Sequence, residues 1–194
     1  MTTTATHIIK KTPTLETERL YLKLLTPETW SAFMTHASDE EIATALAWHT
    51  PETIELEKAK HKGGMTTHFI SFRNFLLLDK ETGTTIGKAG FHTWQARHSR
   101  AEIGYGIDIE SYKRKGLMKE ALKAVIHYGY EEMGLYRIEA FAGPANTGSI
   151  RLLEGLGFTK EGLLRSHYNK AGELQDSVCY GLLKPEYERV KTGW

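Results

Sequence analysis

The residues with the clearest chemical potential form a short basic run that leads into a helix. Lysine and arginine occupy positions 113–115, Gly116 follows, and a regular apolar pattern continues to Met133. Apolar residues at spacings of one, three and four predict an amphipathic helix over 115–133. The first N–H groups of a helix lack an intrahelical acceptor and carry partial positive charge. The pattern therefore predicts a phosphate or pyrophosphate site, although a solvated basic turn before an ordinary amphipathic helix would show the same residues.

The segment before this turn predicts a strand whose backbone is open to a ligand. Apolar residues at the odd positions of 103–109 alternate with Gly104 and Gly106. Glycines on one face of a strand often mark a bulge or a place where another chain lies against the backbone. A ligand chain could bond there to the N–H and C=O groups of Ile107 and Ile109. A dinucleotide-binding fingerprint is not indicated, because the third glycine is absent and the glycines lie inside the strand.

Three polar side chains outside the turn are candidates for catalysis or binding. Glu102, near the start of the strand, could take a proton from an amine directly or through a water, but a surface glutamate at a strand end is the simpler explanation. Asn146 is suited to cap a helix that runs to about Leu156. Ser149 lies one turn into that helix, where its hydroxyl could face a ligand or belong to an ordinary first-turn residue.

Composition limits the class of protein. The 194 residues are 40% hydrophobic and 25% charged, as in a soluble globular domain. A formal net charge of +1 creates no global attraction to nucleic acid or to an anionic membrane. No apolar run approaches the roughly 20 residues that span a bilayer. We therefore expect neither a nucleic-acid nor a membrane partner.

Cysteine and histidine usage restricts the chemistry further. The single Cys179 excludes an internal disulfide and favours a reducing, cytoplasmic location. The nine histidines show no metal-binding spacing, so no metal site is predicted. The Thr-rich segment 1–14 lacks the apolar core of a signal peptide, and we expect a flexible tail there, followed by a single domain over 15–187.

Turn signals and apolar periodicity predict a mixed α/β protein. Leu20, Leu22 and Leu24 alternate with polar residues in a strand that ends at Thr26 and Pro27, a helix start signal. Further helices are expected over 27–36, 39–47, 51–61, 115–133 and 146–156, and further strands over 68–79, 84–94, 100–110, 136–142 and twice within 158–183. Antiparallel strands followed by a βαβ crossover predict a mixed sheet with helices on both faces.

Short motifs from Thr17 to about Glu186 occur in an order typical of one enzyme family. They are Thr17-Glu18-Arg19-Leu20, Ile86-Gly87, Ala101-Glu102-Ile103-Gly104-Tyr105, Lys115-Gly116-Leu117-Met118-Lys119-Glu120-Ala121, Leu135-Tyr136-Arg137-Ile138, Asn146 with Ser149, Leu153-Glu154 with Gly157-Phe158, Glu161-Gly162 with Arg165, and Asp176 with Tyr180, Leu182 and Leu183. In this order and spacing the chain resembles the GNAT superfamily of acetyl-CoA-dependent N-acetyltransferases, specifically its RimJ/RimL-like branch. The resemblance implies a GNAT fold with about seven mostly antiparallel strands and a central βαβ crossover, and acetyl-CoA as the acetyl donor.

The resemblance also implies roles for individual residues. The pyrophosphate of acetyl-CoA would bind at the turn formed by Arg114, Lys115, Gly116, Leu117, Met118 and Lys119. The pantetheine arm would pair with Ile107, Asp108 and Ile109 as a pseudo-strand and would contact Asn146. Glu102 would be the catalytic base, and Ser149 would lie near the thiol sulfur. A neutral amine would attack the thioester directly, assisted by proximity and by a backbone N–H group that polarises the carbonyl.

Some positions depart from the family's pattern. Lys113 stands where the phosphate motif usually begins with Gln or Arg, and Met118 stands in place of a small residue. Both changes are compatible with binding through the backbone. Leu153 stands where other GNAT branches place a tyrosine as general acid. The proton for the leaving thiolate could therefore come from Ser149, from a water or from no dedicated acid.

The amine acceptor is the part that the sequence defines least. The resemblance favours a protein or peptide N-terminus; the alternatives are a small amine, polyamine or drug, or a non-catalytic acyl-CoA-binding module on the same fold. We expect residues 27–68 to build the acceptor site. Trp30, Trp48, His49 and Trp94 would either line that site or pack in the core. Two copies of the chain could pair through the last strands as a homodimer.

Overall fold

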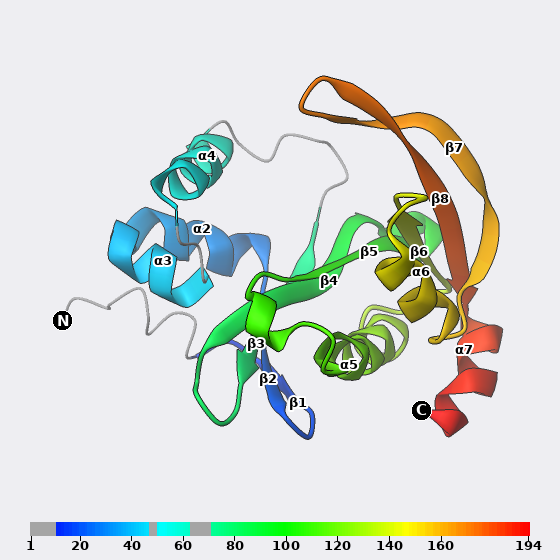
Figure 1. Ribbon diagram of the computed structural model, residues 1–194. Helices are drawn as coiled ribbons and strands as arrows, with labels where there is room; N and C mark the ends of the chain where they lie inside the picture. The colour runs from blue at the N-terminus through cyan, green and yellow to red at the C-terminus, as the bar shows by residue number, and fades with distance from the viewer. Residues whose placement is uncertain (1–10, 47–49, 63–70) are drawn as a thin grey trace. The chain divides into compact units, whose positions relative to one another are not determined.

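The computed structural model describes residues 11–46, 50–62 and 71–194 (Figure 1). Most of the expected tail, Trp48, His49 and the first residues of the strand expected over 68–79 lie outside these ranges. No helix within the described ranges is both long and apolar enough to cross a membrane.

The described elements follow the predicted order. The strands are β1 Thr14–Glu16, β2 Leu20–Leu25, β3 Arg73–Asp79, β4 Thr85–Gln95, β5 Arg100–Ile107, β6 Arg137–Ala142, β7 Thr159–Lys170 and β8 Glu173–Leu183. The helices are α2 Pro27–His36, α3 Asp39–Leu46, α4 Pro51–Lys62, α5 Leu117–Glu131, α6 Thr147–Glu154 and α7 Lys184–Val190.

Three features differ from the prediction. The strand expected over 100–110 ends at Ile107, and Glu110–Tyr112 forms a 3-10 turn instead. β1 begins at the last residue of the expected tail, and α7 follows the last expected strand. β1 has only three residues and α7 only seven. Neither is long enough to show a periodic apolar pattern, which is why the sequence did not indicate them.

The strands form one eight-stranded sheet in the order β1-β2-β3-β4-β5-β6-β8-β7. β5 and β6 pair in parallel and α5 connects them in the chain, so the predicted βαβ crossover is confirmed. The pairs β1–β2, β2–β3, β3–β4, β6–β8 and β7–β8 are antiparallel. The mixed, mostly antiparallel sheet is therefore as predicted, and the short β1 makes eight strands where about seven were expected.

The described chain divides into two compact units. The first unit contains the residues up to Trp94 together with Gly104–Val125, and the second contains Gln95–Ile103 and Ile126–Trp194. β5 and α5 each contribute residues to both units.

In the first unit, α2 begins at the predicted start signal. Thr26 and Thr29 form a capping box, in which Thr26 N–H donates to Thr29 Oγ1 at 2.7 Å and Thr29 N–H donates to Thr26 Oγ1 at 3.3 Å. Pro27 stands at the first helical position, where no N–H group is needed. The buried core formed by α2, α3 and α4 with β2 and β3 contains Leu25, Phe33, Met34, Ile42, Leu46, Ile54, Phe72 and Leu76.

The opposite face of β2 and β3 is buried as well. Leu22 lies opposite Leu77 in the register, and both side chains are fully buried. The predicted apolar stripe of α5 is also buried at Leu117, Ala121 and Val125. The first unit therefore buries both faces of its sheet, as predicted for a sheet with helices on both sides.

In the second unit, the core lies on one face of β6 and β8, and β7 and β8 extend as a long hairpin (Figure 1). Ala140 of β6 lies opposite Tyr180 of β8, and both are buried. Tyr130 of α5 donates its hydroxyl hydrogen to the carbonyl oxygen of Leu182 at 2.7 Å and stacks on Tyr187 of α7 with ring centroids 4.5 Å apart. Aromatic packing of this kind explains how α7 is held despite its short length.

A close backbone contact joins β4 to β5 in the first unit. A Cβ atom at Gly87 would lie 2.1 Å from the carbonyl oxygen of Gly106 and 2.9 Å from the Cα atom of Ile107. Beside this contact, Asp108 N–H donates to the carbonyl oxygen of Ile86 at 2.9 Å. Only a residue without a Cβ atom fits at position 87, which gives a physical reason for the glycine in the Ile86-Gly87 motif.

We predict that Gly87→Ala destabilises the protein by about 1–3 kcal/mol, the usual cost of overpacking. The new methyl group would push β4 away from the β5 backbone, and urea unfolding would measure the loss. Gly162→Ala is a matched control, because a Cβ atom there has no neighbour within 4 Å. The control should leave stability unchanged or raise it slightly. Parent-like stability of Gly87→Ala would contradict the close approach.

Candidate active site

The predicted phosphate turn connects β5 to α5 through two residues in the left-handed region. Arg114 has a φ of 60° and Gly116 a φ of 79°. The carbonyl of Gly116 accepts the first helical bond, from Glu120 N–H at 3.1 Å. Helix geometry then leaves the N–H groups of residues 117–119 without an intrahelical acceptor. Left-handed residues followed by a helix start orient successive N–H groups into a concave site suited to an anion.

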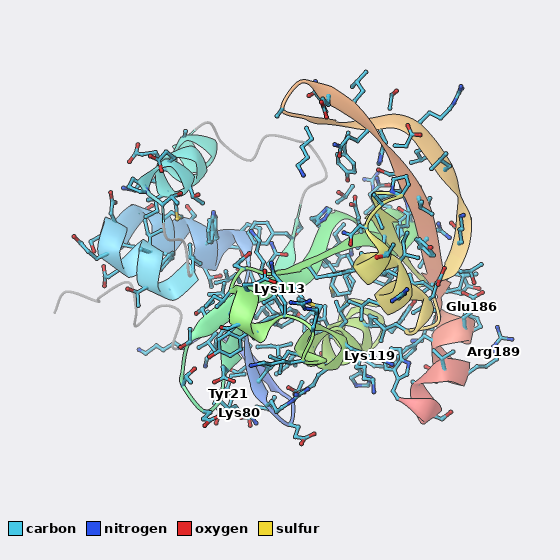
Figure 2. All side chains as sticks on the ribbon, in the orientation of Figure 1. Tyr21, Lys80, Lys113, Lys119, Glu186 and Arg189 are labelled. Atoms are coloured by element: carbon cyan, nitrogen blue, oxygen red, sulfur yellow. The ribbon has the colours of Figure 1, made fainter. Side chains whose placement is uncertain are left out.

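Basic side chains occur along this turn, and Figure 2 labels Lys113, which precedes α5, and Lys119, which lies in its first turn. Lys113 Nζ pairs with Glu110 Oε2 at 2.7 Å, and Arg114 Nη2 lies 3.8 Å from Glu110 Oε1. The Lys113 ammonium lowers the pKa of the Glu110 carboxyl. Arg114 is 89% exposed, and exposed pairs of this kind contribute little stability. Both cations can therefore turn to a bound anion at small cost.

The N-terminal hairpin holds the turn from one side. Thr17 Oγ1 donates to Glu120 Oε1 at 2.5 Å, and Arg19 N–H donates to the same oxygen at 2.8 Å. Arg19 Nε donates to Glu120 Oε2 at 2.7 Å, and Arg19 Nη1 donates to the carbonyl oxygen of Lys115 at 3.0 Å. The Thr17-Glu18-Arg19-Leu20 motif therefore contacts the Lys115–Ala121 motif directly, a relation that the sequence analysis did not assign.

The strand segment before the turn has an edge suited to pairing with a ligand. Asp108 N–H is taken by Ile86 of β4, and successive residues of an extended chain direct their N–H groups to opposite edges. The N–H groups of Ile107 and Ile109 therefore face the edge away from β4. β6 pairs with β5 only over Arg100–Glu102, so within the described residues this edge has no partner strand beyond that point. A Cβ atom at Gly106 would meet open space, which leaves room beside the backbone.

Glu102 lies in the second unit, where it is half-buried beside a tyrosine of the β7–β8 hairpin. Tyr168 Oη donates to Glu102 Oε1 at 3.4 Å, a long hydrogen bond. Burial raises the pKa of Tyr168, and the Glu102 carboxylate raises it further. Tyr168 contacts the ring of His167, which in turn lies against Phe141 with centroids 4.8 Å apart. The carboxylate thus lies beside an aromatic cluster of the β7–β8 hairpin and β6.

A chain of ion pairs joins residues of β5, β6 and β7 in the second unit. Arg137 donates from Nη1 to Glu161 Oε1 at 2.7 Å and from Nε to Glu139 Oε1 at 2.8 Å. Arg100 Nη1 reaches Glu139 Oε2 at 2.6 Å. The two carboxylates raise the pKa of Arg137, and Arg137 lowers the pKa of Glu161. A Cβ atom at Gly181 would lie 2.4 Å from Glu161 Oε1, so the glycine leaves space for the bidentate pair.

Asn146 caps α6, as predicted. Its Oδ1 atom accepts the Ser149 N–H group at 3.1 Å. Asn146 is exposed, and the cap uses only the side-chain oxygen, so the amide nitrogen can still donate to a ligand. Ser149 is half-buried in the first turn of α6. The structure therefore places both residues at the same helix start in the second unit.

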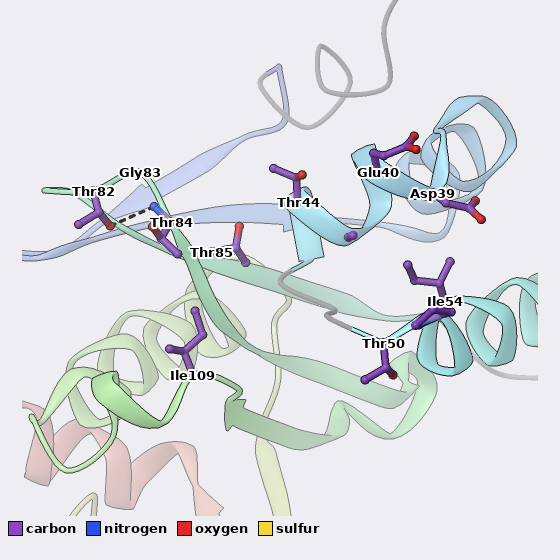
Figure 3. Close-up of a pocket in the computed structure, with 12 residues that line it drawn as sticks. Asp39, Glu40, Thr44, Thr50, Ile54, Thr82, Gly83, Thr84, Thr85 and Ile109 are labelled. Carbon is purple, nitrogen blue, oxygen red and sulfur yellow. Dashed lines mark hydrogen bonds between the residues drawn. The ribbon is translucent and has the colours of Figure 1, made fainter.

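A cavity of about 690 Å³ lies in the first unit between α3, α4 and the β3–β4 hairpin (Figure 3). The residues that line it include Asp39, Glu40, several threonines and Ile109 of the predicted pantetheine segment. Asp39 also pairs with Lys58 of α4. The volume is within the range of small-molecule sites.

The predicted site residues fall into two groups. The phosphate turn and residues 107–109 come together in the first unit, whereas Glu102, Asn146 and Ser149 lie in the second. Of the aromatic residues proposed for the acceptor site, Trp30 packs against the α2–α4 core. Trp94 lies under Arg73, whose guanidinium carbon is 5.2 Å from the ring centroid. Trp48 and His49 lie outside the described residues.

Comparison with known proteins identifies the family. Residues 19–159 match the acetyltransferase (GNAT) domain. The chain is 37% identical over 177 residues to the uncharacterised N-acetyltransferase p20 of Bacillus licheniformis, a match that covers 90% of this chain and 98% of that protein. It is 34% identical over 114 residues to the ribosomal protein uS5-alanine N-acetyltransferase of Escherichia coli, over 58% of each chain.

The chain belongs to the GNAT superfamily of N-acetyltransferases. A GNAT acetyltransferase of Bacillus anthracis has the same fold, with a TM-score of 0.63 and 27% identity over 90% of this chain and all of that one. The family uses acetyl-CoA as the acetyl donor, so the predicted enzyme class and donor are confirmed. The match to the Escherichia coli enzyme also confirms the resemblance to the ribosomal-protein N-acetyltransferase branch.

Long-range contacts account for the residues that sequence reasoning did not assign. Arg19 and Glu120 are separated by 101 positions, and Tyr168 and Glu102 by 66. Arg19 and Glu120 each belong to a motif of the family resemblance, but the sequence did not indicate that the two motifs are in contact. Tyr168 belongs to none of the motifs. Spacing rules for helices and strands apply to residues a few positions apart, so they could not predict either contact. The only sequence signal for the contact of Arg19 with Glu120 was that two motifs of the family carry opposite charges.

Substitutions at Asn146 are expected to separate its capping role from a role in ligand binding. Asn146→Ala should cost about 0.5–2 kcal/mol of stability because the Ser149 N–H group loses its acceptor. Asn146→Asp keeps an acceptor at the cap and should keep stability, but it has no amide nitrogen to donate. Thermal unfolding and the KM for acetyl-CoA would be measured together. A parent-like KM for Asn146→Asp would show that the residue is only a cap.

Proposed function

We propose that this GNAT enzyme transfers the acetyl group of acetyl-CoA to the primary amine of a protein or peptide N-terminus. The observation that carries the donor side is the turn before α5, with its left-handed residues Arg114 and Gly116 and its unpaired helical N–H groups. Similarity to an enzyme named for the alanine of ribosomal protein uS5 supports a peptide N-terminus as acceptor.

We further infer a cytoplasmic location from the single cysteine of the chain.

In this proposal the first unit binds the donor. The N–H groups of residues 114–119 and the side chains of Arg114, Lys115 and Lys119 bind the pyrophosphate. The backbone of Ile107 and Ile109 pairs with the pantetheine arm along the open edge of β5. Both contacts are made chiefly by the main chain, so Lys113 and Met118 fit the site although they depart from the family's usual residues.

The second unit carries the groups proposed for chemistry. A neutral amine attacks the thioester carbonyl, an N–C bond forms, and the C–S bond breaks to release the thiolate of coenzyme A. Glu102 accepts the proton that the amine loses, directly or through a water. Asn146 holds the pantetheine, and Ser149 lies near the sulfur, where its hydroxyl or a water returns a proton to the thiolate. Holding both reactants in place supplies a large part of the rate enhancement.

A small amine or polyamine is the alternative acceptor, and the cavity in the first unit favours it. Asp39 and Glu40 are among the residues that line this cavity. Carboxylates attract ammonium groups, and an amine with a second positive charge would gain most from them.

The β7 edge strand, with Leu163 51% exposed, is the surface through which a homodimer would form.

Glu102→Gln is expected to lower kcat by about 10²–10⁴-fold, the usual contribution of a general base. The KM for acetyl-CoA should change little, because the substitution preserves shape and lies outside the donor turn. Glu139→Gln, on the adjoining strand in register with Glu102, is the matched control and should retain turnover. Full turnover of Glu102→Gln would remove the residue from the mechanism.

Thiol release from acetyl-CoA, measured against N-terminal peptides, polyamines and aminoglycosides, tests the acceptor. We expect release with peptides, and with alanine-initiated peptides above others, because the Escherichia coli relative is named for an alanine. Release only with polyamines or aminoglycosides would replace the peptide proposal by the small-amine alternative. Mass spectrometry of the product would show whether the α-amine or a side-chain amine carries the acetyl group.

A further inference from the structure

Glu120 is the residue through which the N-terminal hairpin contacts the donor turn. Its carboxylate is 16% exposed and receives three hydrogen bonds from Thr17 and Arg19, while a fourth bond joins Arg19 to the Lys115 carbonyl. Burial raises the pKa of Glu120, but the bonds from Thr17 and Arg19 lower it by more, so the carboxyl group is ionised at neutral pH. All four residues lie in the first unit.

The bond from Arg19 to Lys115 has a consequence for the turn that follows from peptide geometry. The C=O and N–H groups of a trans peptide point in opposite directions. The Lys115 carbonyl points to Arg19, so the N–H group of Gly116 points away from Arg19. A Cβ atom at Gly116 would lie 3.6 Å from Arg19 Nη2, which shows that the guanidinium packs directly beneath this glycine.

The charge balance at the turn depends on the same contact. Glu120 stands in the first turn of α5, where a negative charge favours the helix dipole but repels an anionic ligand. Arg19 neutralises this carboxylate at 2.7 Å. Without Arg19, an ionised carboxylate would remain one helical turn from the proposed pyrophosphate.

We propose that Thr17, Arg19 and Glu120 are positioning residues for acetyl-CoA, which orient the Lys115–Gly116 peptide and neutralise the charge at the start of α5. The inference rests on the proposed role of the turn in pyrophosphate binding. It goes beyond that role by assigning donor affinity to a hairpin that need not touch the ligand itself.

A positioning role differs measurably from a stabilising role. An ion pair that only stabilises the fold would change the melting temperature and leave the affinity of the folded enzyme for coenzyme A unchanged. A positioning pair changes this affinity at temperatures where every variant is folded. It also leaves kcat at saturating acetyl-CoA nearly unchanged, because the groups proposed for chemistry are elsewhere.

The experiment compares Arg19→Met, Arg19→Lys, Glu120→Gln and the Arg19→Met/Glu120→Gln double variant by calorimetric binding of coenzyme A and by acetyl-CoA kinetics. Arg19→Met should weaken binding about tenfold or more, since one change misorients the peptide and leaves Glu120 unpaired. Arg19→Lys should restore part of the affinity because it keeps the charge. The double variant should bind better than Arg19→Met, because the unpaired carboxylate is gone.

Two further variants keep the outcomes distinguishable. Glu188→Gln removes the α7 carboxylate that pairs with Lys191, and it should leave the binding of coenzyme A unchanged. Gly116→Glu places bulk and negative charge in the turn itself and should abolish binding. Loss of binding in Gly116→Glu with normal binding in Arg19→Met would overturn the positioning role and leave the donor turn in place. Normal binding in Gly116→Glu would overturn the donor turn itself.

Discussion

The reversal of the backbone between β5 and α5 is the constraint on which the proposed donor site of this enzyme depends. The chain must leave an extended strand and enter a helix within ten residues, from Ile107 to Leu117. It does so through two left-handed residues and a 3-10 turn. This path leaves the first N–H groups of α5 without backbone acceptors. Unpaired N–H groups would destabilise a helix start that is buried without a ligand. At a helix start that binds a phosphate, the same N–H groups donate to the ligand.

Two close backbone approaches determine how the sheet supports this turn. Gly87 lets β4 lie against Gly106, and the bond from Asp108 to Ile86 assigns alternate N–H groups of β5 to β4. The remaining N–H groups of the segment face the opposite edge, where β6 pairs only with the first residues of β5. When no ligand is bound, a strand edge with unpaired N–H and C=O groups can pair with another chain and cause aggregation. A donor with an extended, amide-containing arm can occupy such an edge.

Charged residues have different uses in the two units. In the first unit, the carboxylate of Glu120 is surrounded by donors from the N-terminal hairpin and adjoins the proposed anion site. In the second unit, Arg137 of β6 joins Glu139 on its own strand to Glu161 of β7, and Glu102 accepts a hydrogen bond from Tyr168.

The sequence by itself determined those features that arise from local pattern. The apolar stripe of α5, the helix start at Thr26 and Pro27, the cap at Asn146 and the βαβ order are all readable from residues a few positions apart, and the structure confirms them. Family resemblance added the donor and the enzyme class. The tertiary structure alone decided the early end of β5, the placement of β1 and α7, and the contacts of Arg19 with Glu120 and of Tyr168 with Glu102. The physical reason is sequence separation. Helix caps and apolar stripes depend on neighbours within one or two turns of the same helix. The ion pair of Arg19 with Glu120 spans 101 positions, so it forms only after folding has brought the two residues together.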